Sequence, residues 1–326
     1  GIEHLFLPYF YRIRRGEKVI GALENSYRCL STASRSGLFE GMINTSWDDS
    51  GLHNQIWMMS WINSAEFSWS GAAPTLDEFM EKFFVSYYGP KARDLRELFE
   101  LLNDGSYFYM DAFEHKVWHH GEIGKTHLPD LPRGDAVEYD PYWKTEYAEM
   151  LSRSRAQEDA MERARRICRS NLENGVRHSY DFEVFLTLAD LISHTARTYI
   201  SLAELKDSVR DAHRAHFVSN REAARKLEQA AGIVEANLAE REGVFSNLVE
   251  VWEKTRLPKG LDLPDKEFFF QQDRARHFAF RRPDMSYLIC DEVKLGLEDY
   301  LADLREYIRW YRAEYGLCPG EDGKAR

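Results

Sequence analysis

Cysteine is scarce and long apolar runs are absent, and each shortage argues against a class of protein. The 326 residues include four cysteines, which lie far apart at Cys29, Cys168, Cys290 and Cys318. We therefore expect no disulfide framework and no clustered zinc site, and the unpaired thiols favour the cytoplasm. No stretch of about 18 apolar residues occurs, so no membrane-spanning helix is expected. The first residue is Gly1 rather than Met, which indicates a cut end, so secretion and cellular location stay open.

An excess of positive charge is also missing. Lysine and arginine number 43 and aspartate and glutamate 54, which gives a net charge of −11. A nucleic-acid partner is therefore not expected, because such proteins carry a basic face. The sequence contains no glycine-rich phosphate loop and no nucleophile elbow. We expect no cofactor.

One cluster of metal-ligating residue types occurs, around His115 and His119. Their i, i+4 spacing would place both on one face of a helix, where a divalent cation could bind. No third ligand at helical spacing is obvious, and the neighbouring Trp118 suits ordinary packing. We therefore expect no metal site.

Residues 1–72 alternate between strand and helix patterns. Short apolar runs at Leu5–Leu7 and Leu38–Ile43 predict strands, and the spacing of apolar residues predicts helices over Val19–Ser34 and from Ile56 to Phe67. A polar loop, Asn44–Gly51, lies between the second strand and the second helix. This order is typical of the last units of a TIM-type β/α barrel. Two strands cannot close a barrel, so this part looks incomplete.

Residues 73–140 are predicted to be a helical connector. Thr75 can cap a helix that begins at Leu76, because Asp77 and Glu78 follow in its first turn. A second helix is predicted from Lys91 to Leu102, and the Gly-, Pro- and Asp-rich residues 121–140 predict a long loop.

Residues 141–326 predict an antiparallel bundle of long helices, so the fold class is mainly α. Apolar residues recur every three or four positions in four segments, the pattern of left-handed helix pairing. Short connections near Asn174 and Phe217 make consecutive helices antiparallel. His213 and His216 close the second segment, where the helix dipole favours a cation. The stripes comprise Tyr147, Met150, Met161, Ala164, Cys168 and Leu172; Phe185, Leu188, Ile192, Thr195, Tyr199, Leu202 and Val209; Ala224, Leu227, Ala231, Val234, Leu238, Phe245, Leu248 and Trp252; and Val293, Leu297, Tyr300, Leu304, Ile308, Tyr311 and Tyr315.

The loop that follows the second predicted strand carries the candidate substrate-binding residues Trp47, Asp48, Asp49 and His53. It lies where barrel enzymes place their sites. An indole face covers the apolar C–H side of a sugar ring, while carboxylates accept hydrogen bonds from its hydroxyls. The alternative is structural: Asp48 or Ser50 caps the next helix, and the tryptophans belong to the core.

The run Gly41–Gly51, together with the aromatic helix that ends Ser64–Trp69, resembles the end of the catalytic barrel in the family-20 glycoside hydrolases, the β-N-acetylhexosaminidases and their relatives. The resemblance implies that Trp47 forms a wall of the pocket for the terminal sugar and that Asp49 holds its hydroxyls. Asp49 occupies the position of the glutamate in the family's Trp-x-Glu motif, and its shorter side chain reduces the reach of the carboxylate.

The resemblance also implies substrate-assisted cleavage by a neighbouring Asp-Glu pair in a His-x-Gly-Gly-Asp-Glu setting. Asp-Glu occurs here only at Asp77–Glu78 and Asp291–Glu292, and both are interpreted as solvated helix ends. No catalytic residue is therefore assigned. The hypothesis is a carboxy-terminal part of a glycosidase that binds an N-acetylhexosaminide together with the missing barrel portion. The rival is a non-catalytic helical module for assembly or partner binding. Self-association stays open, since Phe268–Phe270 could form an exposed aromatic strip.

Overall fold

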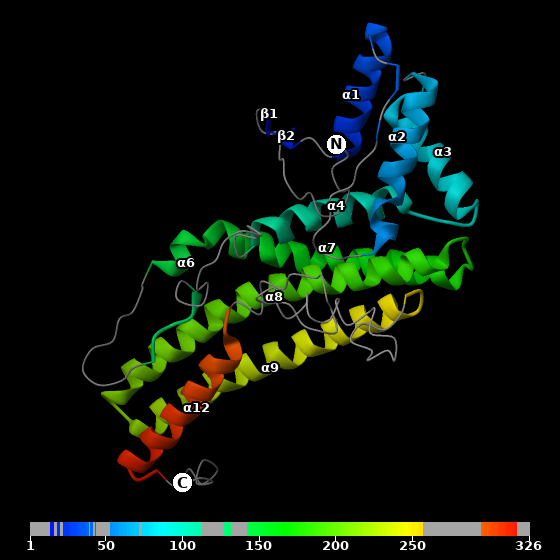
Figure 1. The fold of residues 1–326 in the computed structure, drawn as a ribbon. Coiled ribbons are helices and arrows are strands. Elements are labelled where there is room, and N and C mark those ends of the chain that lie inside the picture. Colours follow the sequence, from blue (N-terminus) through cyan, green and yellow to red (C-terminus); the bar gives the residue numbers. More distant parts are fainter. Residues whose placement is uncertain are drawn as a thin grey trace, which may run out of the picture. The chain divides into compact units, whose positions relative to one another are not determined.

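The computed structural model describes residues 14–15, 18–19, 22–38, 40–41, 43, 53–71, 74–112, 127–131, 142–256 and 295–317. These residues are mainly helical, as the sequence predicts (Figure 1). The chain divides into two compact units. The first unit comprises Gly1–Val117, Ala156–Ser193 and Val244–Cys290, and the second comprises Trp118–Arg155, His194–Gly243 and Asp291–Arg326.

Three long helices contribute residues to both units, and shorter elements belong to one unit each. The long helices are α7 (Ala148–Glu173), α8 (Ser179–His216) and α9 (Asn220–Glu253). The first unit also contains β1 (Arg14–Arg15), β2 (Lys18–Val19), α1 (Ala22–Ser36), η1 (Asn54–Trp57), α2 (Met58–Ser70), α3 (Leu76–Phe83), η2 (Phe84–Tyr88) and α4 (Leu95–Asp111). The second unit also contains α6 (Trp143–Glu146) and α12 (Leu297–Glu314). No helix among the described residues is long and apolar enough to cross a membrane.

The strand predicted over Leu38–Ile43 is wrong at the positions that the structure describes. Leu38, Glu40, Gly41 and Ile43 lie in no strand. The side chains of Leu38 and Ile43 are 83% and 88% exposed, because the sheet of the described residues consists only of β1 paired antiparallel with β2 and offers them no neighbour. The other predicted strand, Leu5–Leu7, lies outside the described residues.

The helices predicted on either side of that segment are present. α1 begins three residues later than predicted, because Val19 pairs with Arg14 in the β1–β2 hairpin. α1 packs on α2, where the ring of Tyr27 meets the ring of Phe67 edge-on at 4.7 Å. Asn63 Nδ2 of α2 donates to the carbonyl oxygen of Leu23 at 3.4 Å. The buried face of α2 includes small serines, which let the two backbones approach closely.

Both predicted connector helices are present, the first with the predicted start and the second with other bounds than predicted. Thr75 and Glu78 form a complete capping box at the start of α3, as predicted. The exposed Asp77–Glu78 pair therefore belongs to a solvated helix start. α4 begins at Leu95 rather than Lys91 and runs on to Asp111 through Gly105. A Cβ at Gly105 would lie 2.8 Å from Met161 Cε and 3.1 Å from Ile192 Cδ1, so glycine allows close helix packing here.

The bundle prediction is confirmed for the second stripe, whose members from Phe185 to Val209 are all buried. The third stripe is confirmed from Ala224 to Val234 and again at Phe245 and Leu248, and it departs from the prediction between them. Leu238 is half-buried, whereas Asn237 and Arg241 are 4% and 7% exposed. Arg241 lies three positions after Leu238 and four before Phe245, so it falls on the same stripe, and the stripe is buried again at Phe245 and Leu248.

α12 runs antiparallel to α9 in the second unit (Figure 1). Three arginine–glutamate pairs join the two helices in opposite order along them, Arg241–Glu298, Arg305–Glu235 and Arg312–Glu228. The fourth stripe is buried at Leu297, Leu304, Ile308 and Tyr311, while Tyr315 at its end is 38% exposed. The possible aromatic strip Phe268–Phe270 lies outside the described residues.

Candidate functional site

Among the predicted substrate-binding residues, the structure describes His53. Trp47, Asp48 and Asp49 lie outside the described residues, as do the possible metal ligands His115 and His119. In the part of the chain that is described, no group of three His, Cys, Asp or Glu side chains could hold a metal ion.

His53 ends the candidate loop and lies directly before η1. Its side chain is 1% exposed, and its ring contacts Trp252 edge-on at 5.0 Å and Tyr180 at 6.3 Å between centroids. The carbonyl of His53 accepts from the backbone N–H of Ile56 at 3.2 Å. Packing and backbone bonding together fix the point where the loop meets the helix. A direct contact of His53 with sugar stays a prediction.

The tryptophans that follow the loop differ in burial. Trp57 is 5% exposed and meets Trp61 edge-on at 6.0 Å, as the structural alternative for the tryptophans predicts. Trp69 is 93% exposed. The tryptophan at the start of this helical segment therefore packs in the core, whereas the tryptophan at its end lies on the surface.

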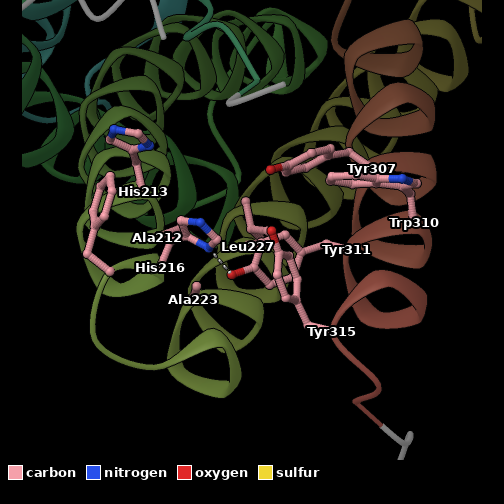
Figure 2. A pocket seen from close by; sticks show the side chains of 10 residues that line it. Ala212, His213, His216, Ala223, Leu227, Tyr307, Trp310, Tyr311 and Tyr315 are labelled. Atoms are coloured by element: carbon pink, nitrogen blue, oxygen red, sulfur yellow. Dashed lines mark hydrogen bonds between the residues drawn. The ribbon is translucent and has the colours of Figure 1, made fainter. Parts of the chain in front are cut away.

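A cavity that the sequence analysis did not identify lies in the second unit. It has a volume of about 380 Å³ and lies between the end of α8, the start of α9 and the carboxy-terminal part of α12. Figure 2 shows His216 of α8 directed towards Tyr311 of α12, and the rings of His216 and Tyr315 lie 5.4 Å apart. We call this cavity the aromatic pocket, after the rings of Phe217, Tyr307, Trp310, Tyr311 and Tyr315 that line it.

A chain of hydrogen bonds crosses the aromatic pocket. Tyr311 Oη donates to Asn220 Oδ1 at 3.1 Å and lies 2.8 Å from His216 Nδ1 (Figure 2). Because the hydroxyl proton is used towards Asn220, Nδ1 of His216 carries the hydrogen that it donates to Tyr311 Oη. Burial raises the pKa of Tyr311 to about 12, so its phenol stays protonated at neutral pH.

No protein-family model, curated protein or solved structure matches the chain. Function is therefore argued from the chemistry of the sites.

Sequence periodicity contained a signal for the aromatic pocket. Tyr311 and Tyr315 end the fourth stripe, which we interpreted as one bundle seam, whereas Tyr307 and Trp310 were not part of that stripe. The packing seam of α12 ends level with the turn from α8 into α9. Beyond that turn, the last rings of the stripe line the aromatic pocket. The two histidines do occupy the last turn of α8, as predicted, and they also line this hollow.

Another group of polar and aromatic side chains, which the sequence did not predict either, surrounds Asp181 at the start of α8. Tyr88 Oη, at the end of the π-helical turn η2, donates to Asp181 Oδ2 at 3.2 Å. Tyr87 stacks on His178, with centroids 3.9 Å apart. Burial raises the pKa of Asp181 to about 6, although the tyrosine hydrogen bonds oppose the shift. π-helical turns and shifted carboxyls both occur often at functional sites. We interpret the cluster as structural, because Asp181 is 4% exposed and is held by its hydrogen bond to Tyr88.

The raised pKa of Asp181 predicts a pH-dependent stability. Between about pH 4 and pH 6 the folded state holds a proton that the unfolded state releases, so stability falls as pH rises through this window and stays lower above it. Asp181→Asn removes the buried charge and keeps an acceptor for Tyr88. We expect it to raise the free energy of unfolding near pH 8 by up to about 3 kcal/mol and to change it little near pH 4. Urea unfolding of both proteins at the two pH values measures this. A difference that is independent of pH would contradict it.

Proposed function

We propose that this chain is the carboxy-terminal part of a glycoside hydrolase that resembles the family-20 β-N-acetylhexosaminidases. In this proposal, residues 1–72 are the last units of its β/α barrel, residues 73–140 connect them, and residues 141–326 form an appended helical bundle. The observation that carries the proposal is the run Trp47-Asp48-Asp49 directly ahead of the helix formed by η1 and α2. Loops at this position form the sites of barrel enzymes.

Each residue of the loop has a stated role in this proposal. The indole of Trp47 covers the apolar face of the terminal N-acetylhexosamine, and the carboxylate of Asp49 accepts hydrogen bonds from its hydroxyls. Asp48 contributes a second acceptor. His53 lies at the end of the loop, and its buried ring holds that end against Trp252 and Tyr180.

Exposed apolar side chains in the first unit also support an incomplete barrel. Leu38, Ile43 and Trp69 are 83%, 88% and 93% exposed. Large apolar side chains left in water cost free energy, and a strand without neighbours also lacks partners for its backbone groups. Further barrel units would cover such residues. The proposal therefore explains why Leu38–Ile43 has the sequence of a strand, although its described residues lie in no strand.

A non-catalytic helical module for assembly or partner binding is the second candidate. It is favoured by the large share of helix in the described residues and by the sequence contexts of the two Asp-Glu pairs. The pair at Asp77–Glu78 lies at an exposed helix start, and Asp291–Glu292 lies outside the described residues. The two candidates differ in whether the complete protein turns over an N-acetylhexosaminide.

The purified chain alone tests one part of the proposal, the absence of a catalytic pair. We expect no turnover of an aryl N-acetylglucosaminide by the purified 326 residues, because substrate-assisted cleavage needs an acid and an acetamido-orienting carboxylate held together at the substrate. Hydrogen exchange on the same sample should show slow exchange in α7, α8 and α9, which would demonstrate that inactivity is not due to unfolding. Steady turnover would contradict the proposed absence of a catalytic pair, and Asp48 and Asp49 would be the first residues to substitute.

A further inference from the structure

The aromatic pocket has the composition of a site for a small neutral molecule. Ten residues line it, and none of them is Asp, Glu, Lys or Arg. Its volume of about 380 Å³ is at the small end of the range for ligand pockets, about 300 to 1,000 Å³, and suits one or two rings. The nearby cation Arg312 is already paired with Glu228 of α9. An anionic ligand would therefore meet no lysine or arginine in the lining.

The rim of the pocket carries aromatic surface that the fold has not covered. Phe217, Trp310 and Tyr315 are 76%, 48% and 38% exposed, whereas Tyr307 and Tyr311 of the same helix face are buried. Trp310 stacks on Tyr307 with an interplanar angle of 26° and 5.5 Å between centroids, which fixes the plane of the indole. Fixed aromatic faces beside a hollow offer a ring-shaped ligand apolar contact at little cost in conformational entropy.

The floor of the pocket carries polar groups that form hydrogen bonds. The Tyr311 hydroxyl bridges Asn220 and His216 Nδ1, and His216 carries a second polar ring nitrogen, Nε2. The ring of His213, which also lines the pocket, lies 5.4 Å from the ring of Phe217. A purely apolar ligand would make no hydrogen bond to these groups, and covering polar atoms without giving them a partner costs free energy. A cation would gain from the aromatic faces, but it would find no carboxylate among the lining residues.

We propose that the aromatic pocket of α8, α9 and α12 binds a neutral sugar ring, as a carbohydrate site distinct from the Trp47 loop. The C–H face of the ring lies against Trp310 at the rim, and its hydroxyls bond to the imidazole and phenol groups of the floor. This inference goes beyond the proposed function, since it depends only on the second unit and requires no catalytic pair. A helical bundle appended to a glycosidase would thereby hold a substrate chain near the enzyme.

The test is a calorimetric titration of the full 326-residue chain with N-acetylglucosamine, N,N′-diacetylchitobiose and cellobiose. We expect at least one of these sugars to bind, and Trp310→Ala to weaken its binding at least about tenfold. Tyr315→Ala should weaken it less, since that ring lies at the end of α12. Trp69→Ala is the matched control, because it removes another exposed tryptophan outside the pocket, and its affinity should stay within about twofold of the unsubstituted chain.

Several results would overturn the proposal. Equal affinity of Trp310→Ala and the unsubstituted chain would show that the sugar binds elsewhere. Binding of tetramethylammonium or inorganic phosphate, with none of the sugars bound, would show that the pocket serves a charged ligand. No binding of any sugar would overturn it as well. Circular dichroism of each variant excludes unfolding as the cause of a loss. Failure of the proposed glycosidase activity would leave these titrations unaffected, so the two proposals fail separately.

Discussion

Phe245→Asp is expected to destabilise the protein by more than about 4 kcal/mol, enough to unfold most of the chain at room temperature. Phe245 lies in α9 and is fully buried. The substitution removes a large apolar side chain and places a carboxylate where it loses its water, so the cavity and the desolvation penalties add. Urea unfolding followed by circular dichroism measures the change.

The neighbouring residue provides the control for this prediction. Ser246 is exposed on the same helix, and Ser246→Asp introduces the same charged side chain into the same sequence. We expect it to change the free energy of unfolding by less than about 0.5 kcal/mol. Similar midpoints for the two variants would show that the face of α9 assigned as buried is wrong.

Trp47→Ala in the complete protein is expected to lower kcat/KM for an aryl N-acetylglucosaminide about 30-fold, which corresponds to about 2 kcal/mol of lost sugar contact. Asp49→Asn should lower it less, because the amide still accepts a hydrogen bond while losing the charge that strengthens it. Steady-state kinetics of both variants give these values.

The control for the sugar pocket is Tyr142→Ala, which removes an exposed aromatic ring from the second unit. We expect its kcat/KM to stay within about twofold of the unsubstituted enzyme, since surface substitutions away from special features have small effects. If Trp47→Ala behaves in the same way as Tyr142→Ala, the assignment of the loop as the sugar pocket is contradicted.

The helices could be predicted from the sequence because one physical signal determines them. Apolar residues at a spacing of three and four define a buried face, and the stripe from Phe185 to Val209 is buried throughout. The capping box at Thr75 is similarly local, since its two hydrogen bonds join residues three apart. The prediction failed at Leu238, which is half-buried, while the stripe position three residues later is occupied by the buried Arg241, paired with Glu298.

The sites depend on contacts between distant parts of the chain, and the sequence pattern does not contain these contacts. Burial raises the pKa of the Asp181 carboxyl, and its hydrogen bond with Tyr88 joins residues 93 positions apart in sequence. The aromatic pocket needs α8, α9 and α12 to meet, with His216 and Tyr311 95 positions apart. The prediction of a strand over Leu38–Ile43 failed for a related reason. A strand forms only when it pairs with another strand, and local β propensity does not supply that second strand.

Turnover by the product of the complete open reading frame tests the central proposal most directly. The measurement compares an aryl N-acetyl-β-glucosaminide with the matching aryl β-glucoside, which lacks the 2-acetamido group. In a substrate-assisted mechanism the acetamido oxygen attacks the anomeric carbon, so we expect hydrolysis of the N-acetyl substrate and none of the glucoside. No hydrolysis of either substrate, or equal hydrolysis of both, would contradict a hexosaminidase-type function for the barrel that we propose contains Trp47 and Asp49.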